Sequence, residues 1–235
     1  MKFQPVKGTH DIFGKNLLIY KFIIKKITEL AKIYNYKEII TPIFENSELF
    51  QKNLGENSDV VLKEMYTFND RSNKSLTLRP EYTTAMIRAA ISNNLLEKLP
   101  TKLFGYGPMF RRERPQKGRF RQFNQINFEI LGVNDSYSDA EMIILANNFL
   151  EKVIPNKKFQ LTINSLGDLN TLYKYREELI LFFEKFKNDL SEDSKSKIHN
   201  NPLRILDSKD LKDIDLSLNA PKIHDYYSNF AKNNF

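Results

Sequence analysis

The chain has 235 residues, of which 41% are hydrophobic and 28% charged, as in globular proteins of one or two domains. It contains no cysteine, which excludes disulfides and thiolate metal sites, and its three histidines lack metal-ligand spacing. There is no apolar run of about 18 residues and no signal-peptide core, so we expect a cytoplasmic protein without a membrane partner. The net charge of +7 is compatible with an acidic partner such as nucleic acid.

The first predicted element is an amphipathic helix that follows a Gly-Thr-His-Asp turn at 8–11. Its apolar side chains recur at three- and four-residue steps, the spacing of one helix face. They are Tyr20, Ile23, Ile24, Ile27, Leu30, Ala31 and Tyr34. A short strand is expected over 37–43, with Pro42 at an edge or an end because proline cannot donate a ladder hydrogen bond.

A second helix is predicted after Pro80. The apolar alternation of the preceding strand ends there, and helical spacing begins near Glu81. Proline in the first turn and an acid beside it suit a helix N-terminus. Glu81 is therefore explained either as an acid that complements the helix dipole or as a ligand contact.

The stretch 106–131 is predicted to form two strands joined by a basic loop. Period two sorts the second strand into an apolar face and a polar face. The polar face carries Phe123, Gln125, Asn127 and Glu129, and the apolar face carries Ile126, Phe128 and Ile130. On the first strand, Gly105 and Gly107 share a face with Arg111, which suggests room for a ligand against the backbone.

The loop from Arg111 to Arg121 is strongly basic, with six Arg or Lys and one Glu. Such a loop is either a solvated surface feature or a binding site for polyanions. After the second strand, Ser138 to Glu141 has the pattern of a capping box that opens a helix. A further strand is predicted over 159–163, and helical spacing begins again at Leu169.

Two motifs carry a resemblance to a known family. FRRER at 110–114 followed by RFRQF at 119–123 resembles motif 2 of class II aminoacyl-tRNA synthetases, and RERPQKGRFRQFNQ resembles its histidyl-tRNA synthetase version. LTLRPE at 76–81, with a threonine two residues later, is similar to the segment that holds the α-ammonium of histidine in that family. The first helix, strand and proline resemble motif 1, which builds the family's dimer interface.

The resemblance implies an α+β fold, a class II antiparallel sheet flanked by helices and incomplete at its C-terminal side. Residues 1–166 would form the N-terminal part of the catalytic domain, and 167–235 a mostly helical insertion segment. The implied enzyme is a histidine–tRNA ligase, which forms histidyl-adenylate from ATP and transfers histidine to its tRNA. The implied partners are L-histidine, ATP with Mg²⁺, histidine tRNA and a second copy of the chain, with no tightly bound cofactor and no protein-held metal.

The resemblance also implies roles for individual residues. Arg111 would be the catalytic residue that grips the α-phosphate. The histidine-binding residues would be Glu81, Tyr82, Thr83, Arg111, Gln125 and Glu129, with Tyr82 only a lining residue because the family commonly has Gly there. ATP would contact Arg111, Glu113, Arg119 and Phe123, with Phe123 stacked on the adenine. The tRNA acceptor stem would contact Arg114, Lys117 and Arg121. Asn124, Asn127 and Phe128 receive no catalytic role.

Motif 3, the histidine-specific arginine motif and the anticodon-binding domain have no counterpart that we recognise in the 235 residues. The stretch from Lys222 to Tyr227 resembles the arginine motif only superficially, since it lacks the Arg and the Gly. We therefore expect little adenylation by this chain alone. The alternatives are a non-catalytic relative, such as the regulatory subunit of ATP phosphoribosyltransferase, and a dimerising or RNA-binding fragment.

Overall fold

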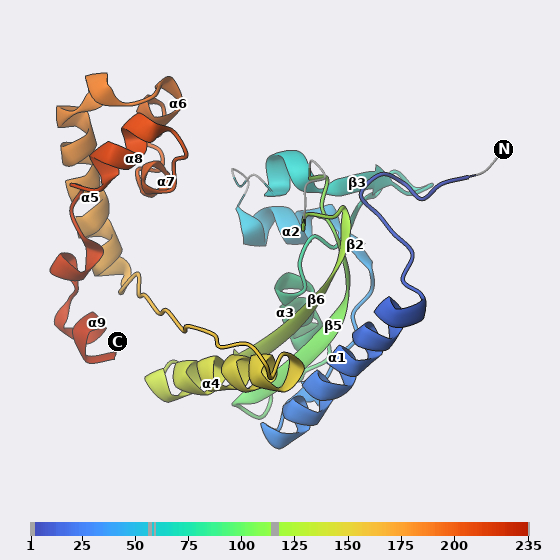
Figure 1. The fold of residues 1–235 in the computed structure, drawn as a ribbon. Coiled ribbons are helices and arrows are strands. Elements are labelled where there is room, and N and C mark those ends of the chain that lie inside the picture. The colour runs from blue at the N-terminus through green and yellow to red at the C-terminus, as the bar shows by residue number, and fades with distance from the viewer. Residues whose placement is uncertain (1–2, 56–57, 59, 114–117, 235) are drawn as a thin grey trace. The chain divides into compact units, whose positions relative to one another are not determined.

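A computed structural model describes residues 3–55, 58, 60–113 and 118–234 (Figure 1). The chain forms two compact units, unit 1 (Met1–Phe159) and unit 2 (Gln160–Phe235). Each unit buries its own apolar side chains. The division between the units lies a few residues before the boundary at 166 that the sequence suggested.

Helix α1 (Gly14–Ile33) presents the predicted apolar face to the core, and its Ile27, Leu30 and Ala31 are buried. The strand expected over 37–43 is wrong in extent. Two shorter strands form instead, β1 (Lys37–Glu38) and β2 (Phe44–Asn46), and they join different sheets. The chain changes sheets in the segment that holds a proline, which could not have donated to either ladder.

The described residues of unit 1 form two three-stranded sheets. The first has the order β1-β5-β6 and includes the hairpin of β5 (Thr101–Phe110) and β6 (Gln122–Leu131). β5 and β6 are antiparallel, while β1 pairs with β5 in parallel. The second sheet has the order β2-β4-β3, with β3 (Tyr66–Asn69) and β4 (Ser75–Leu78). The predicted hairpin and the α+β class are confirmed.

The two faces of β6 pack as period two predicted. Phe123 packs against a buried cluster that includes Met86 of α3 (Thr83–Ser92). Phe128 and Ile130 pack on the opposite side against residues of α1, β5 and α4, and the Phe128 ring stacks on Phe104 with centroids 5.5 Å apart. The hairpin therefore lies between α3 on its polar face and α1 with α4 on its apolar face.

Helix α4 (Ser136–Val153) begins earlier than the capping-box pattern predicted. Its N-cap is Asp135, whose carboxylate accepts a hydrogen bond from the backbone N–H of Ser138 at 2.8 Å. Glu141 does not complete a capping box, because its carboxylate binds Lys102 Nζ at 2.6 Å and the Tyr36 hydroxyl at 3.4 Å. Burial and this nearby carboxylate raise the pKa of Tyr36 above its ordinary value.

The strand predicted over 159–163 is not present. Phe159, Leu161 and Ile163 are all exposed, at 41%, 63% and 53%, and the segment has no strand assignment. Alternating apolar residues form a strand only when another strand supplies backbone partners. No described residue pairs with this segment, so its alternating apolar residues do not form a strand.

The remaining helical elements described in unit 1 precede β3 in the chain. They are α2 (Ser47–Leu54) and a π-helical turn (Val60–Glu64). Helix α2 contacts both α3 and β4. These contacts bring α2 beside the start of α3, where Glu81 and Thr83 lie.

The regular elements described in unit 2 are all helical, and they begin at Leu169. Its elements are α5 (Leu169–Lys185), α6 (Glu192–Lys195), α7 (Leu203–Leu206), α8 (Leu211–Ser217) and α9 (Asn229–Asn234), with 3₁₀ turns at Lys187–Asp189 and Ile223–Tyr226. Tyr175, Leu179 and Phe183 of α5 form the centre of its core. Tyr226 packs beside Tyr175 with ring centroids 5.8 Å apart, so this part of the superficial arginine-motif match serves the core of unit 2. Across the described ranges, no helix is long and apolar enough to cross a membrane.

Candidate functional site

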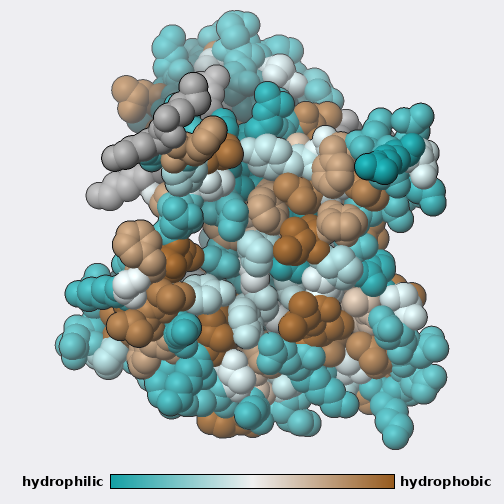
Figure 2. Space-filling view, turned by 90° about the vertical axis from the view of Figure 1, so that its right-hand side faces the viewer, coloured by the Kyte–Doolittle hydropathy of each residue, from teal (hydrophilic) through white to brown (hydrophobic). Residues whose placement is uncertain are grey.

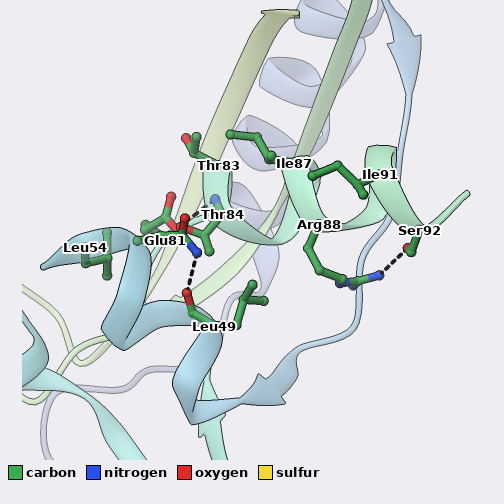
Figure 3. A pocket seen from close by; sticks show the side chains of 10 residues that line it. Leu49, Leu54, Glu81, Thr83, Thr84, Ile87, Arg88, Ile91 and Ser92 are labelled. Atoms are coloured by element: carbon green, nitrogen blue, oxygen red, sulfur yellow. Dashed lines mark hydrogen bonds between the residues drawn. The ribbon is translucent and has the colours of Figure 1, made fainter. Parts of the chain in front are cut away.

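The start of α3 carries two of the predicted binding residues, Glu81 and Thr83. The Glu81 carboxylate accepts a hydrogen bond from the backbone N–H of Thr84 at 2.9 Å, which satisfies one of the free donors at the helix start (Figure 3). Glu81 lies one residue before the N-cap Tyr82, so it is not the first-turn acid that the sequence suggested, but its carboxylate has a local structural role at the helix start. A ligand role for this residue would be additional to it.

A pocket of about 600 Å³ opens between α2 and α3 beside these residues (Figure 3). Most of its exposed lining is apolar. It is formed by Leu49, Asn53, Leu54, Glu81, Thr83, Thr84, Ile87, Arg88, Ile91 and Ser92. Of the predicted site residues only Glu81 and Thr83 line it, so the pocket adjoins the predicted site and does not enclose it.

The polar face of β6 meets the start of α3 through the side-chain amide of Asn127. Its Nδ2 donates to Thr83 Oγ1 at 3.0 Å and to Glu129 Oε1 at 2.7 Å. Its Oδ1 accepts from Gln125 Nε2 at 3.2 Å. One side chain therefore joins three predicted histidine-binding residues from two elements.

The sequence alone did not reveal this bridging role of Asn127. Period two had already placed it on the polar face between Gln125 and Glu129, which was the available signal. The partner that reveals its position is Thr83, 44 residues away in the chain. That contact depends on how α3 packs on the sheet, which the local pattern does not contain.

The Gln125 amide is only half satisfied within the described part of the chain. Its Nε2 donates to Asn127, whereas its Oε1 is buried and has no hydrogen-bond partner. A buried acceptor without a donor is unfavourable by about 1–3 kcal/mol. The site therefore presents an acceptor that a ligand N–H could satisfy.

Arg111 lies just beyond the end of β5, above the ring of Phe123. Its guanidinium carbon is 5.3 Å from the ring centroid, within the range of a cation–π contact. Its Nε donates to the carbonyl of Pro80 at 2.9 Å, directly before Glu81 in the chain. The structure thus brings the predicted phosphate-binding arginine and the predicted adenine platform together at the start of the α3 segment.

The remaining hairpin residues lie in the loop beyond the strands. Glu113 and Arg119 face each other with 3.3 Å between a carboxylate oxygen and Nη1. Arg121 Nε donates to the backbone carbonyl of Glu113 at 3.4 Å. Arg114 and Lys117, predicted to contact tRNA, lie outside the described residues.

The Gly-Thr-His-Asp segment near the N-terminus covers this loop. The Gly8 carbonyl accepts from the backbone N–H of Arg121 at 2.7 Å, and the His10 ring lies 4.8 Å from the Phe120 ring. Gly8 has φ +87°, and a Cβ there would lie 2.8 Å from Cγ of Arg121. The segment can approach so closely only because a glycine occupies this position.

The explanation proposed for Gly105 and Gly107 is wrong. A Cβ on Gly107 would lie 2.5 Å from Nη2 of Arg79, and a Cβ on Gly105 would overlap the ring of Tyr82. The space over both glycines is therefore filled by the protein's own side chains and is not available to a ligand. The Arg79 side chain is buried and donates to the carbonyls of Pro108 and Thr41, each at 3.0 Å; burial lowers its pKa.

Tyr82 does not lie where a pocket-lining residue would. Its side chain is 0% exposed, packs in the core beside Met86, and donates its hydroxyl hydrogen to the Ile39 carbonyl at 3.1 Å. The guanidinium of Arg79 stacks 4.4 Å from its ring centroid. The Tyr82 ring fits because Gly105 has no side chain at the point of contact. Tyr82 therefore packs against β5 of the hairpin.

Among the described residues, no group of three or more His, Asp or Glu is arranged to hold a metal ion. The chemistry available here is accordingly that of guanidinium, carboxylate and amide groups around an aromatic ring.

The chain is similar to proteins of one known family. A family model described as histidyl-tRNA synthetase matches residues 8–177. The histidine–tRNA ligase of Wolbachia pipientis wMel is 51% identical over 228 residues, which cover 97% of this chain and 55% of the relative. That of Orientia tsutsugamushi strain Boryong is 47% identical over 236 residues, covering 100% and 56%. The chain spans about half the length of these relatives.

Solved structures show the same similarity. The apo histidyl-tRNA synthetase of S. aureus matches with a TM-score of 0.76 and 32% identity, covering 100% of this chain and 53% of that one. A Bacillus halodurans C protein described as an ATP phosphoribosyltransferase regulatory subunit/histidyl-tRNA synthetase matches with a TM-score of 0.60 and 20% identity, covering 85% and 56%. At that identity the second match shows a shared fold alone.

Proposed function

The chain belongs to the histidyl-tRNA synthetase family, and we therefore propose that it takes part in ligating L-histidine to histidine tRNA at the expense of ATP. In the first step a histidine carboxylate oxygen attacks the α-phosphorus, pyrophosphate leaves and histidyl-adenylate forms. In the second step a ribose hydroxyl at the 3′ end of the tRNA attacks the histidyl carbonyl carbon and AMP leaves. The proposal concerns the part of the site that unit 1 carries.

The observation that carries the proposal is the position of Arg111. Its Nε is held by the Pro80 carbonyl at 2.9 Å, and its guanidinium lies over the half-buried ring of Phe123. The terminal nitrogens have no hydrogen-bond partner among the described residues, so they can meet phosphate oxygens as a planar fork. Phosphoryl transfer depends mainly on positioning and on neutralising negative charge, which a fixed guanidinium provides.

The histidine-binding part of the proposal rests on acceptor groups. Glu81, Thr83, Gln125 and Glu129 all supply oxygen atoms near the junction of α3 and β6. A histidine ligand brings complementary donors, an α-ammonium group and an imidazole N–H. Phe123 would stack on the adenine of ATP, and Glu113 with Arg119 would contact the rest of the nucleotide.

Magnesium would enter with ATP as the counter-ion of its phosphates. It would neutralise charge on the pyrophosphate as it leaves. The described residues offer no group of three metal ligands, so no step in this proposal depends on a metal held by the protein. No tightly bound cofactor is included in the proposal.

The macromolecular partners in the proposal are histidine tRNA and a second copy of the chain. Arg121, with Arg114 and Lys117, would meet the tRNA acceptor stem.

Apolar side chains of α1 remain exposed, with Leu18 at 69% and Phe22 at 43%, which supports a dimer interface on this helix. Figure 2 looks at the side of the molecule where α1 lies in Figure 1, and hydrophobic side chains interrupt the hydrophilic surface there. We also propose a cytoplasmic location, where tRNA charging takes place.

Calorimetric titration of ATP with Mg²⁺ into the 235-residue chain tests this function. We expect Arg111→Ala to weaken ATP binding by about tenfold or more, the value of a charged hydrogen bond to phosphate. Arg112→Ala is the matched control, because this neighbouring arginine is exposed and contributes a backbone N–H to the Glu64 carbonyl that the substitution preserves.

Equal ATP affinity in wild type and Arg111→Ala would remove Arg111 from the phosphate-binding role. Histidine binding without any ATP binding would favour a non-catalytic relative of the regulatory type. Binding of tRNA that falls steeply with salt and shows no preference for histidine tRNA would favour an RNA-binding fragment.

A further inference from the structure

Asn127 occupies the point where β6 crosses the start of α3. Its amide offers two N–H donors and one carbonyl acceptor. Both kinds of group are engaged: Nδ2 binds Thr83 Oγ1 at 3.0 Å and Glu129 Oε1 at 2.7 Å, and Oδ1 binds Gln125 Nε2 at 3.2 Å. The side chain is therefore fixed by polar contacts on three sides.

This arrangement determines which way the Gln125 amide points. Since Nε2 is directed at Asn127, Oε1 is the end that remains, and it is buried without a partner in the described part of the chain. A rotation of the amide by half a turn would set two carbonyl oxygens against each other at the Asn127 contact. Asn127 therefore makes Gln125 an acceptor toward the site.

The same residue restrains Glu129. Its Oε1 takes the 2.7 Å hydrogen bond from Asn127, and its other oxygen has no hydrogen-bond partner among the described residues. Thr83, held by the same amide, brings a hydroxyl from the neighbouring helix. One neutral side chain thus aligns acceptor groups from two elements without adding a charge of its own.

We propose that Asn127 is a positioning residue, which holds Gln125 and Glu129 as hydrogen-bond acceptors so that the site selects ligands by their ring and ammonium N–H donors. The inference rests on the proposed function, since it takes histidine as the ligand. A site built from fixed acceptors rejects an analogue that lacks the matching donor, because the buried acceptor is then left unpaired.

The first experiment needs no ligand. Hydrogen exchange of the Gln125 side-chain amide is followed by NMR in the wild-type chain and in Asn127→Ala and Asn127→Asp. The aspartate keeps the size and can still accept from Gln125, but it cannot donate to Glu129 or Thr83. We expect slow exchange in wild type and in Asn127→Asp, and fast exchange in Asn127→Ala. The same fast exchange in all three proteins would overturn the proposed orientation of Gln125.

The second experiment measures selectivity. L-Histidine and β-(2-thienyl)-L-alanine, which has the same ammonium group and a ring of similar size without an N–H, are titrated into each protein and followed by NMR. We expect Asn127→Ala to weaken histidine binding by about tenfold. The ratio of the Kd of the thienyl analogue to the Kd of histidine should fall toward one. Asn127→Asp should also weaken histidine binding, because the second carboxylate repels Glu129.

Asn124→Ala is the matched control, since Asn124 lies on the same strand, is exposed and faces away from Asn127. It should leave both readouts unchanged. A residue that only stabilised the fold would weaken both ligands equally, so an unchanged selectivity ratio in Asn127→Ala would overturn the positioning role. If the wild-type chain bound neither amino acid, the proposed histidine function would fail, and the amide exchange would still decide whether Asn127 orients Gln125.

Discussion

The Asp213 cluster of unit 2 and the Asn127 cluster of unit 1 are completed differently. In unit 2 the carboxylate of Asp213 is 0% exposed and accepts the backbone N–H of Ser191 at 2.9 Å. It also accepts the hydroxyls of Ser191, Ser194 and Ser208, each at 2.7 Å. In unit 1 the amide of Asn127 has its partners, but Oε1 of Gln125 is buried without one.

The difference indicates what each cluster is for. The Asp213 cluster ties the start of α6 and the residues before α8 to one carboxylate, and every donor is matched. Folding alone accounts for such a closed cluster. The open cluster in unit 1 leaves an acceptor whose burial is unfavourable by about 1–3 kcal/mol, which a ligand donor would offset. The unmet acceptor of Gln125 therefore distinguishes the open cluster from the closed one.

Removing the centre of the closed cluster should have the largest effect. Asp213→Ala leaves three serine hydroxyls and one backbone N–H without their acceptor, so we expect unit 2 to lose about 3 kcal/mol of stability. Urea unfolding followed through amide NMR signals of α5 measures it. Asp215→Ala is the control, because Asp215 is exposed on the same helix. Equal losses in both variants would show that the buried cluster is not what holds unit 2 together.

The closed cluster should also make unit 2 sensitive to acid. Burial raises the pKa of Asp213, but the four hydrogen bonds outweigh burial and lower it to about 2. The unfolded chain, with an ordinary aspartate pKa near 4, then binds the proton first as pH falls. The stabilisation is present above about pH 4 and is lost toward pH 2, about 2 kcal/mol in all.

Asp168 should add to this effect, because hydrogen bonds from Ser228 and Thr171 lower its pKa to about 2. Urea midpoints of unit 2 at pH 5 and pH 3 measure the change. Asp213→Asn should show a smaller difference between the two pH values than wild type. The same difference in both proteins would mean that other carboxyl groups cause the acid sensitivity.

Much of the hairpin could be predicted from the sequence because period two is a local property. The two faces of β6 and the buried side of α1 follow directly from residue spacing, and the structure confirms both. The predictions that failed depended on distant partners. The strand over 159–163 has the right alternation but no strand beside it, and Glu141 binds Lys102 instead of closing a capping box.

The site shows the same limit. The sequence placed Gln125 and Glu129 on one face, and the family resemblance supplied roles for them. It could not show that Arg79 and Tyr82 fill the space over the two glycines of β5, because that space is decided by tertiary packing. Nor could it show the contact between Asn127 and Thr83, which joins α3 to the sheet.

Replacing an open-cluster residue should affect binding more than stability. Gln125→Met removes the unpaired oxygen and one neutral hydrogen bond to Asn127, and these changes oppose each other. We expect the free energy of unfolding of unit 1 to change by less than about 1 kcal/mol, while histidine binding is lost. Urea unfolding and NMR titration measure the two quantities. Gln122→Met, exposed on the other face of β6, should change neither. A large loss of stability in Gln125→Met with histidine binding intact would reverse the assignment of this cluster.

The smallest expected effect is the stabilisation of unit 1 by bound histidine. It tests directly whether the open cluster, and not the closed one, binds a ligand. A ligand that binds only the folded open cluster should protect unit 1 and leave unit 2 unchanged. At a histidine concentration equal to Kd the protection is about 0.4 kcal/mol, which backbone hydrogen exchange can assign to individual strands and helices. We expect slower exchange in β5 and β6 and no change in α5. Protection confined to α5 would place histidine binding in unit 2, and the unmet acceptor of Gln125 would then need another explanation.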